Sequence, residues 1–210
     1  MTAKSGHKNG ADTRGSVLII GGGPVGLALA AELGRMNIRC TLIEQRDGTI
    51  GFPKMNMVSS RSMEFCRRWG IADDVRRVGW PDDYPLNVVF LTAMTGHELA
   101  RFDYPGYAER GALPHTPDGN RRCPQTLFDP LLQARVREFP SVTLRYRTRL
   151  EEFYNDSDGV HAVLRDVDSN ETRKISADYM VGCDGAESLV RAAAGIDMVG
   201  NPALSHNINV

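Results

Sequence analysis

The sequence lacks a charge excess of either sign: 25 Lys and Arg residues stand against 26 Asp and Glu residues, for a formal net charge of −1. This balance gives no electrostatic reason to expect a nucleic-acid or membrane partner. The sequence also lacks an apolar run near the roughly 20 residues of a membrane span. Because 41% of its residues are hydrophobic, it can still build a substantial core. We expect a soluble globular protein of one large domain, or of one domain and part of a second.

The cysteines and histidines are too scattered for a metal site or a disulfide framework. The four cysteines form no C-x-x-C pair and the five histidines form no close pair, so no metal-binding residue is predicted. Widely spaced, reduced thiols favour a cytoplasmic protein. Residues 1–15 are polar and contain no apolar segment of the kind found in secretory signals. They predict a flexible leader.

A glycine-rich segment, SVLIIGGGPVG at residues 16–26, is the feature around which the chain is organised. Its four apolar residues predict a strand buried on both faces of a parallel sheet, and an apolar helix follows from Pro24. Gly21, Gly23 and Gly26 have G-x-G-x-x-G spacing. In that order they allow a tight turn, close approach of a pyrophosphate, and close packing of helix on strand. Phosphate would lie at the N-terminus of the helix.

An acidic residue stands where such a fold binds a ribose. Residues 39–43 predict a second strand, and Glu44 closes it, near the spacing of roughly 20 residues from the glycine turn expected for a ribose-binding acid. Its carboxylate would accept hydrogen bonds from both ribose hydroxyls and repel a 2′-phosphate, which favours NAD or FAD. The alternative is a purely structural glycine turn with Glu44 as an ordinary solvated residue.

The rest of the chain mixes helical and extended patterns. Helices are predicted at 59–69, 71–78 and 125–139. Strands are predicted at 86–92 and 97–102 as a hairpin, at 142–144, at 147–154, 160–166 and 172–176 as an antiparallel meander, and at 179–181 as another buried strand. Residues 45–58 and 104–120 predict loops. Arg145, Arg147 and Arg149 alternate and predict one solvated strand face.

A second motif, CDGAESLVR at residues 183–191, follows the meander and the last strand. With the glycine turn, it resembles the FAD-dependent aromatic hydroxylases related to para-hydroxybenzoate hydroxylase and phenol hydroxylase. The match falls at Cys183, Asp184, Gly185, Ser188, Val190 and Arg191. Residues 59–71 resemble the family helix that begins with a cofactor-contacting arginine, here Arg61. Residues 123–132 resemble the segment whose glutamine contacts the flavin side of FAD, here Gln125.

This resemblance implies a fold and a function. The fold class is α/β, a Rossmann-like FAD-binding parallel sheet with an antiparallel β-meander crossover and an incomplete substrate domain. The function is the FAD-binding portion of an NAD(P)H-dependent flavoprotein monooxygenase that hydroxylates an aromatic or polyketide-like substrate. FAD supplies the chemistry, so no catalytic residue is assigned. The cofactor-binding residues are predicted to be Gly21, Gly23, Pro24, Val25, Gly26, Glu44, Gln45, Arg46, Arg61, Gln125, Asp184 and Gly185, the last two near the FAD pyrophosphate and the path of NADPH or NADH.

The chain departs from the family in one respect. A third family motif begins with Gly-Asp and contacts the ribityl chain, and this sequence has no Gly-Asp dipeptide. We therefore expect an N-terminal part of a longer hydroxylase: a leader at 1–15, an FAD-binding domain at 16–200 with inserted strands at about 86–102, and the start of a truncated substrate domain at 201–210. Alone, it would be inactive and prone to self-association through open sheet edges. The alternatives are a non-catalytic nucleotide-binding fragment and an FAD-dependent dehydrogenase or oxidase.

Overall fold

The computed structural model describes residues 16–111 and 113–201. The predicted leader, and all of the predicted start of a substrate domain after residue 201, lie outside the described residues.

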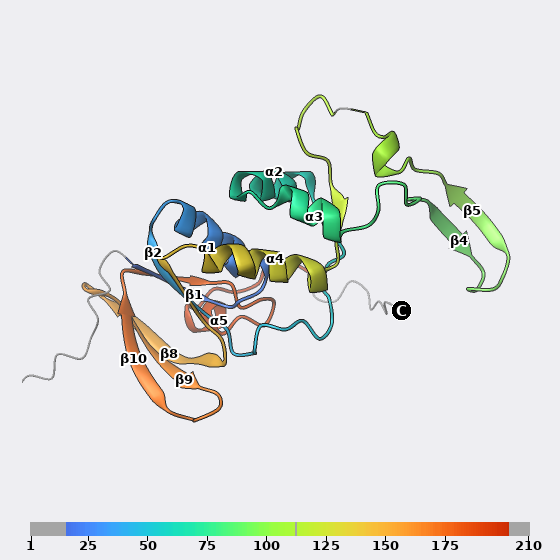
Figure 1. The fold of residues 1–210 in the computed structure, drawn as a ribbon. Helices are drawn as coiled ribbons and strands as arrows, with labels where there is room; N and C mark the ends of the chain where they lie inside the picture. Colours follow the sequence, from blue (N-terminus) through green and yellow to red (C-terminus); the bar gives the residue numbers. More distant parts are fainter. Residues whose placement is uncertain (1–15, 112, 202–210) are drawn as a thin grey trace, which may run out of the picture.

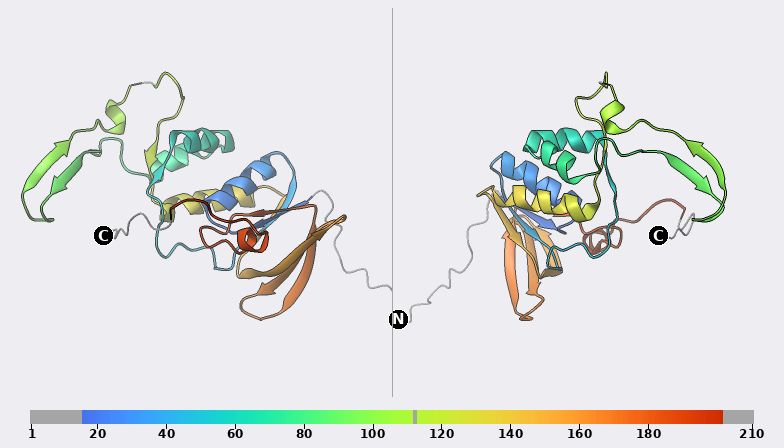
Figure 2. Two further views of the ribbon diagram at one scale, coloured as in Figure 1. Left: turned by 180° about the vertical axis from the view of Figure 1, so that it is seen from behind. Right: turned by 45° about the vertical axis from the view of Figure 1, so that its right-hand side comes forward.

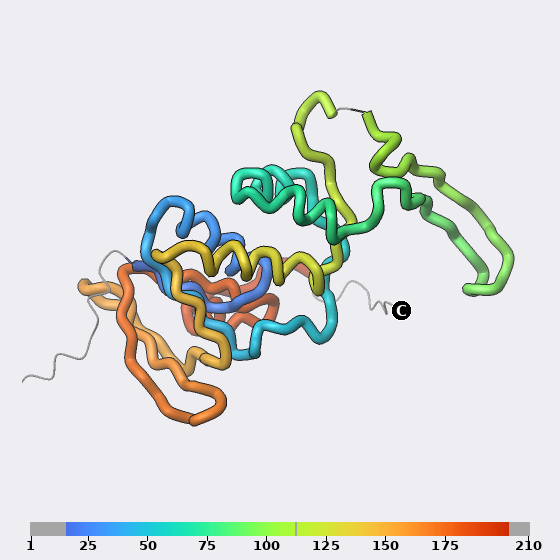
Figure 3. The backbone as a smooth tube through the Cα atoms, viewed as in Figure 1, coloured from blue at the N-terminus to red at the C-terminus, as the bar shows by residue number. Residues whose placement is uncertain are grey.

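A parallel sheet of four strands forms the centre of the molecule, in the order β11-β1-β2-β7 (Figure 1). The strands are β1 (Ser16–Ile20), β2 (Arg39–Ile43), β7 (Val142–Arg145) and β11 (Tyr179–Gly182). All three pairings are parallel, as predicted. The strands β1 and β11, first and last in the sequence, lie side by side (Figure 3). The glycine turn and the second motif therefore meet at the carboxyl ends of these two strands.

Helices cover one face of this sheet (Figure 1). They are α1 (Pro24–Arg35), α2 (Ser60–Trp69), α3 (Ala72–Val78) and α4 (Gln125–Arg137). Ile19 and Leu42 of the sheet pack with Leu27 of α1 and Leu132 of α4 in the larger hydrophobic core. Among the described helices, none combines the length and the hydropathy that crossing a bilayer requires.

The predicted meander covers the other face. It comprises β8 (Thr148–Asp156), β9 (Gly159–Asp166) and β10 (Thr172–Ala177), paired antiparallel in the order β10-β9-β8. Leu18 and Ile20 pack against this sheet, whereas Ile19 faces the helices. The alternation follows from the two-residue period of a strand. Because β1 is covered on both faces, it requires an apolar run without polar interruptions.

Two extended-segment predictions are corrected by the fold. Tyr179 of β11 is 68% exposed, because β11 is an edge strand and not a buried one. Arg145, Arg147 and Arg149 do not share a strand face: Arg145 ends β7, Arg149 belongs to β8, and Arg147 lies in the turn between them with φ 53°. The guanidinium of Arg147 forms an ion pair with Asp168.

A hairpin of β4 (Val88–Leu91) and β5 (Glu98–Phe102) extends away from the three layers in every view (Figures 1 and 2). Its strands pair only with each other in the described sheets. Val88 pairs with Phe102 and Phe90 with Ala100, which places these four apolar side chains on one face. Beside the hairpin, residues predicted as loop form β3 (Met57–Val58) and the 3₁₀ turn η1 (Tyr107–Glu109), and β3 pairs with β6 (Arg121–Arg122), where no element was predicted. The short α5 (Leu189–Ala193) follows β11.

Glu32 connects two of the helices. Its carboxylate accepts hydrogen bonds from Arg35 on its own helix and from the indole N–H of Trp69 on α2 (2.8 Å), and it lies 3.3 Å from Arg68. The hydrogen bond from Arg35 lowers the pKa of Glu32 most, and the hydrogen bond from Trp69 and the nearby charge of Arg68 add to this effect. The pKa falls to about 2 from its ordinary value of 4.5. The ionised carboxylate therefore contributes to the packing of α1 on α2.

The Glu32→Gln variant is expected to be less stable by about 1 to 2 kcal/mol at pH 7, because Gln keeps an acceptor for Trp69 but loses the charge. Since the folded pKa lies below the unfolded value, this stabilisation is complete above pH 4.5 and is lost as the pH falls toward 2. Urea unfolding at pH 7, 4 and 3 measures the difference, since the last two values lie in the range where the stabilisation is lost. If the difference in unfolding free energy between the two proteins stayed constant or increased on acidification, this role of Glu32 would be contradicted.

Candidate cofactor site

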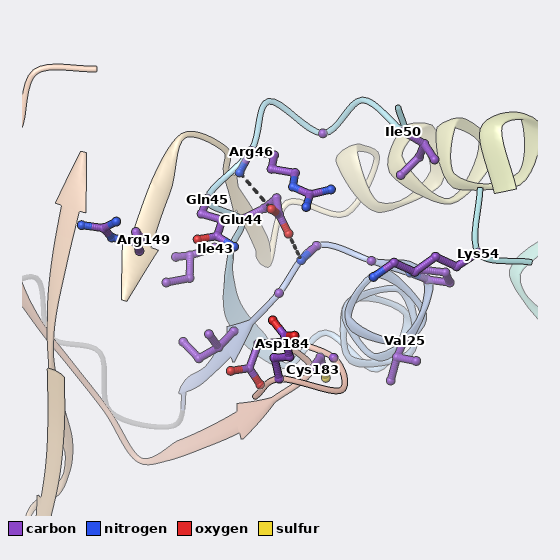
Figure 4. A pocket seen from close by; sticks show the side chains of 18 of the residues that line it. Val25, Ile43, Glu44, Gln45, Arg46, Ile50, Lys54, Arg149, Cys183 and Asp184 are labelled. Atoms are coloured by element: carbon purple, nitrogen blue, oxygen red, sulfur yellow. Dashed lines mark hydrogen bonds between the residues drawn. The ribbon is translucent and has the colours of Figure 1, made fainter. Parts of the chain in front are cut away.

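A cavity of about 490 Å³ lies at the carboxyl ends of β1 and β2, beside the end of β11. Open parallel sheets bind ligands at this edge, and the volume is within the usual range for cofactor sites. Its walls come from the glycine turn, the segment after β2, the start of β8 and the segment after β11 (Figure 4). The lining includes Gly21, Gly23, Pro24, Val25, Glu44, Gln45, Arg46, Gln125, Asp184 and Gly185. Ten of the twelve predicted cofactor residues thus meet in one place; Gly26 and Arg61 do not line it.

Gly21 and Gly26 are required by packing within the protein. Gly21 has φ +106°, a conformation that favours glycine. A Cβ added there would overlap the backbone of Cys183, and one added at Gly26 would overlap the carbonyl oxygen of Gly21. The two glycines therefore let β1, α1 and the segment after β11 approach closely, which is the role predicted for Gly26.

Gly23 differs, because nothing in the protein lies within 4 Å of an added Cβ. It precedes α1 and makes no side-chain cap, and Pro24 occupies the first turn. The first N–H groups of a helix have no intrahelical partner, so that of Val25, which lines the cavity, is available there. This arrangement suits a phosphate at the start of α1, and the open space at Gly23 is where a pyrophosphate would approach.

The Glu44 carboxylate is held in place by two backbone groups. Its Oε2 accepts a hydrogen bond from the N–H of Gly22 and its Oε1 accepts one from the N–H of Arg46, both 2.8 Å (Figure 4). A Cβ at Gly22 would lie 2.8 Å from Cβ of Glu44, so Gly22 must also be small. Each carboxylate oxygen keeps a free lone pair for a ribose hydroxyl. Sequence spacing did not identify Gly22, although its place between two motif glycines was the available signal.

Asp184 lines the cavity, but its carboxylate bonds within the protein. It accepts hydrogen bonds from the hydroxyl of Ser188 (2.5 Å) and from the N–H of Val190 (3.1 Å), while Ser188 accepts the N–H of Arg191. The N–H groups of Val190 and Arg191 at the start of α5 are therefore capped by Asp184 and Ser188 and are not free for a phosphate. Burial, with the nearby charge of Asp184, raises the pKa of the Cys183 thiol, which keeps it protonated at neutral pH.

Gln125 connects α4 to the cavity wall formed by residues 45–54. Its Oε1 accepts a hydrogen bond from the N–H of Lys54 (2.8 Å) and its Nε2 donates one to Asp129 (3.0 Å). Burial raises the pKa of Asp129 to about 6. The wall itself was predicted only as a loop, and its lining residues from Gly48 to Lys54, like Arg149 of β8, were not identified as site residues.

Arg61 lies on the surface, outside the residues that line the cavity. Its side chain is 69% exposed, forms an ion pair with Glu64 (2.7 Å) and stacks on Phe65. Its contact with the cofactor pyrophosphate stays a prediction.

The sequence matches the family described as FAD binding domain over residues 14–210. The FAD-dependent monooxygenase apdD of Emericella nidulans is 34% identical over 196 residues, which are 90% of this chain and 31% of that protein. A structure of the rebeccamycin biosynthetic enzyme RebC with reduced flavin is 42% identical, with a TM-score of 0.82 over 89% of this chain and 36% of that chain. The flavin-dependent monooxygenase PieE, in complex with FAD and substrate, is 33% identical, with a TM-score of 0.81 over 90% of this chain and 33% of that chain. The chain thus spans about a third of the length of these relatives.

Proposed function

We propose, on the premise that this chain belongs to the FAD binding domain family, that its cavity holds FAD for an NAD(P)H-dependent monooxygenase reaction. The observation that carries the proposal is the placement of Glu44, whose carboxylate is fixed by two backbone N–H groups opposite the uncapped start of α1. An acid for the ribose and free N–H groups for the pyrophosphate fit the two ends of an ADP moiety. The cavity residues fit this group.

The chain's own residues would bind and orient the cofactor. Glu44 holds the adenosine ribose, the α1 N-terminus at Val25 faces the pyrophosphate, and Gln125 faces the flavin half. Arg61 and Asp184 are proposed to lie near the pyrophosphate as the resemblance implies. When bound, FAD would supply the redox chemistry, with NADPH or NADH as the proposed reductant and oxygen transfer to a substrate as the outcome. No side chain is assigned an acid or base role.

The substrate class is proposed from relatives. The matched proteins include polyketide hydroxylases of Streptomyces and a hydroxylase crystallised with aklavinone and FAD. We propose an aromatic or polyketide-like substrate for the protein to which this chain contributes. A cytoplasmic location is supported by its four cysteines, none of them in a disulfide. Self-association is supported by the unpaired edges of the β4–β5 hairpin.

Titration of the purified chain with FAD tests the proposal. FAD and ADP are expected to compete for one site, and 2′-phosphorylated ADP is expected to bind at least about tenfold more weakly, because its extra charge would approach the Glu44 carboxylate. Quenching of flavin fluorescence and calorimetry measure the affinities. If FAD does not bind, or if the 2′-phosphate makes no difference, the proposed site is wrong.

A further inference from the structure

Helix α4 carries a buried polar stripe that the cofactor motif does not account for. Gln125, Asp129 and Gln133 are spaced four residues apart and are 6%, 0% and 9% exposed. This spacing puts them on one face of the helix. The first and third residues of the stripe bind the cavity wall: Gln125 accepts the N–H of Lys54, and Gln133 donates to the carbonyl oxygen of Gly48 (2.8 Å). The stripe therefore faces the segment that forms one side of the cofactor cavity.

The two partners of Gln125 determine which way its amide points. The N–H of Lys54 needs an acceptor, so it binds the amide oxygen, and a carboxyl oxygen of Asp129 accepts from the amide nitrogen. If the amide were rotated by 180°, its nitrogen would face the N–H of Lys54, which is also a donor. Its oxygen would face the carboxylate of Asp129, which is also an acceptor. Gln125 also lines the cavity. After its bond to Asp129 the amide nitrogen keeps a second N–H that can donate toward a ligand, and the oxygen, which accepts from Lys54, keeps one lone pair.

Asp129 is otherwise an unfavourable residue at its position. It is fully buried, and its Oδ1 has no hydrogen-bond partner among the described residues. An uncompensated buried carboxyl costs stability, and an apolar side chain of similar size would avoid that cost. The one hydrogen bond that its side chain makes in the described part of the chain is to Gln125. A role in orienting the Gln125 amide accounts for a carboxyl at position 129, whereas packing alone does not.

We propose that Asp129 is a positioning residue that fixes Gln125 as a hydrogen-bond donor toward the flavin half of FAD. The inference rests on the proposed function, since it assumes FAD in this cavity. Asp129 touches Gln125 and acts through it. The ligand group that the second N–H of Gln125 binds is an acceptor, such as a carbonyl oxygen or an unprotonated ring nitrogen. The wall keeps its second attachment through Gln133 when Asp129 is changed, so the two roles are separable.

The test compares Asp129→Asn with Asp129→Leu, and with Asp129→Ala in case leucine packs badly. Asn keeps an oxygen that can accept from Gln125, whereas Leu and Ala do not. Loss of one such hydrogen bond is expected to weaken FAD binding about three- to tenfold in Asp129→Leu and Asp129→Ala. Asp129→Asn should retain the wild-type FAD affinity. ADP affinity should be unchanged in all three variants, because ADP lacks the flavin half.

Gln133→Leu is the matched control, because it removes an attachment of the wall without touching Gln125. It should not selectively weaken FAD relative to ADP. Thermal unfolding of each variant without ligand shows that it is folded. Unchanged FAD affinity in Asp129→Leu and Asp129→Ala, or equal losses of FAD and ADP affinity, would overturn the positioning role alone. Absence of FAD binding by the wild-type chain would overturn the proposed function and this role with it.

Discussion

Replacing Gly26 with alanine is expected to destabilise the fold severely, whereas the same replacement at Gly23 is expected to leave folding intact and weaken cofactor binding. A Cβ at Gly26 would overlap the carbonyl oxygen of Gly21, which cannot move without shifting β1 from α1. We expect a loss of about 3 kcal/mol or more, larger than the gain of about 1 kcal/mol from the helix propensity of alanine. Gly23 has extended backbone (φ −74°, ψ −177°) and open space around it.

Thermal unfolding and FAD titration of both variants measure this contrast. The Tm of Gly23→Ala should lie within about 4 °C of the wild type, and that of Gly26→Ala should fall by about 6 °C or more. FAD affinity of Gly23→Ala should fall at least about tenfold, because its methyl group occupies the space nearest the start of α1. Wild-type FAD affinity in a folded Gly23→Ala protein would show that the pyrophosphate lies elsewhere. A stable Gly26→Ala protein would contradict the packing role.

The Glu44→Ala variant is expected to lose about 2 to 4 kcal/mol of binding free energy for both FAD and ADP, or about 30- to 1000-fold in Kd. Two effects act together. The ribose hydroxyls lose a charged acceptor, and the N–H groups of Gly22 and Arg46 lose the carboxylate that they hold. The equal loss for the two ligands is diagnostic, because they share only the ADP moiety.

Two controls separate these effects from a general disturbance of the fold. Glu44→Gln keeps one acceptor oxygen and should lie between Glu44→Ala and the wild type. Glu171→Ala removes an exposed glutamate that does not line the cavity and should leave both affinities unchanged. Calorimetry with FAD and with ADP provides the values. Equal ADP affinities for Glu44→Ala and the wild type would show that Glu44 does not bind the ribose.

The features that the sequence predicted correctly are those encoded locally. An apolar run, three spaced glycines and a proline specify the turn from β1 to α1, and alternating patterns specify the meander. The glycine turn and the segment at Asp184 meet because β1 and β11 are neighbours. That pairing was accessible only through the family resemblance, because no local pattern states which strands are adjacent.

The features that were missed depend on the tertiary neighbours of a residue. Tyr179 and Val181 look like a buried strand until β11 is found at the edge of the sheet. Asp129 looks like an ordinary helix residue, and its burial beneath the cavity wall follows from how α4 packs on the loop. The loop lining from Gly48 to Lys54 has no periodic pattern, so its contacts could not be read from the sequence.

Because β4 and β5 pair only with each other among the described strands, hydrogen exchange and denaturation report on different parts of this chain. A segment that packs mainly on itself can open while the core stays folded, so its backbone amides exchange with solvent at a free-energy cost set locally. Hydrogen exchange would then divide the chain into a slowly exchanging part around Ile19 and Leu42 and a rapidly exchanging hairpin. Denaturation midpoints for the variants above reflect the cooperative core, and changes confined to Phe90 or Phe102 would leave those midpoints almost unaltered.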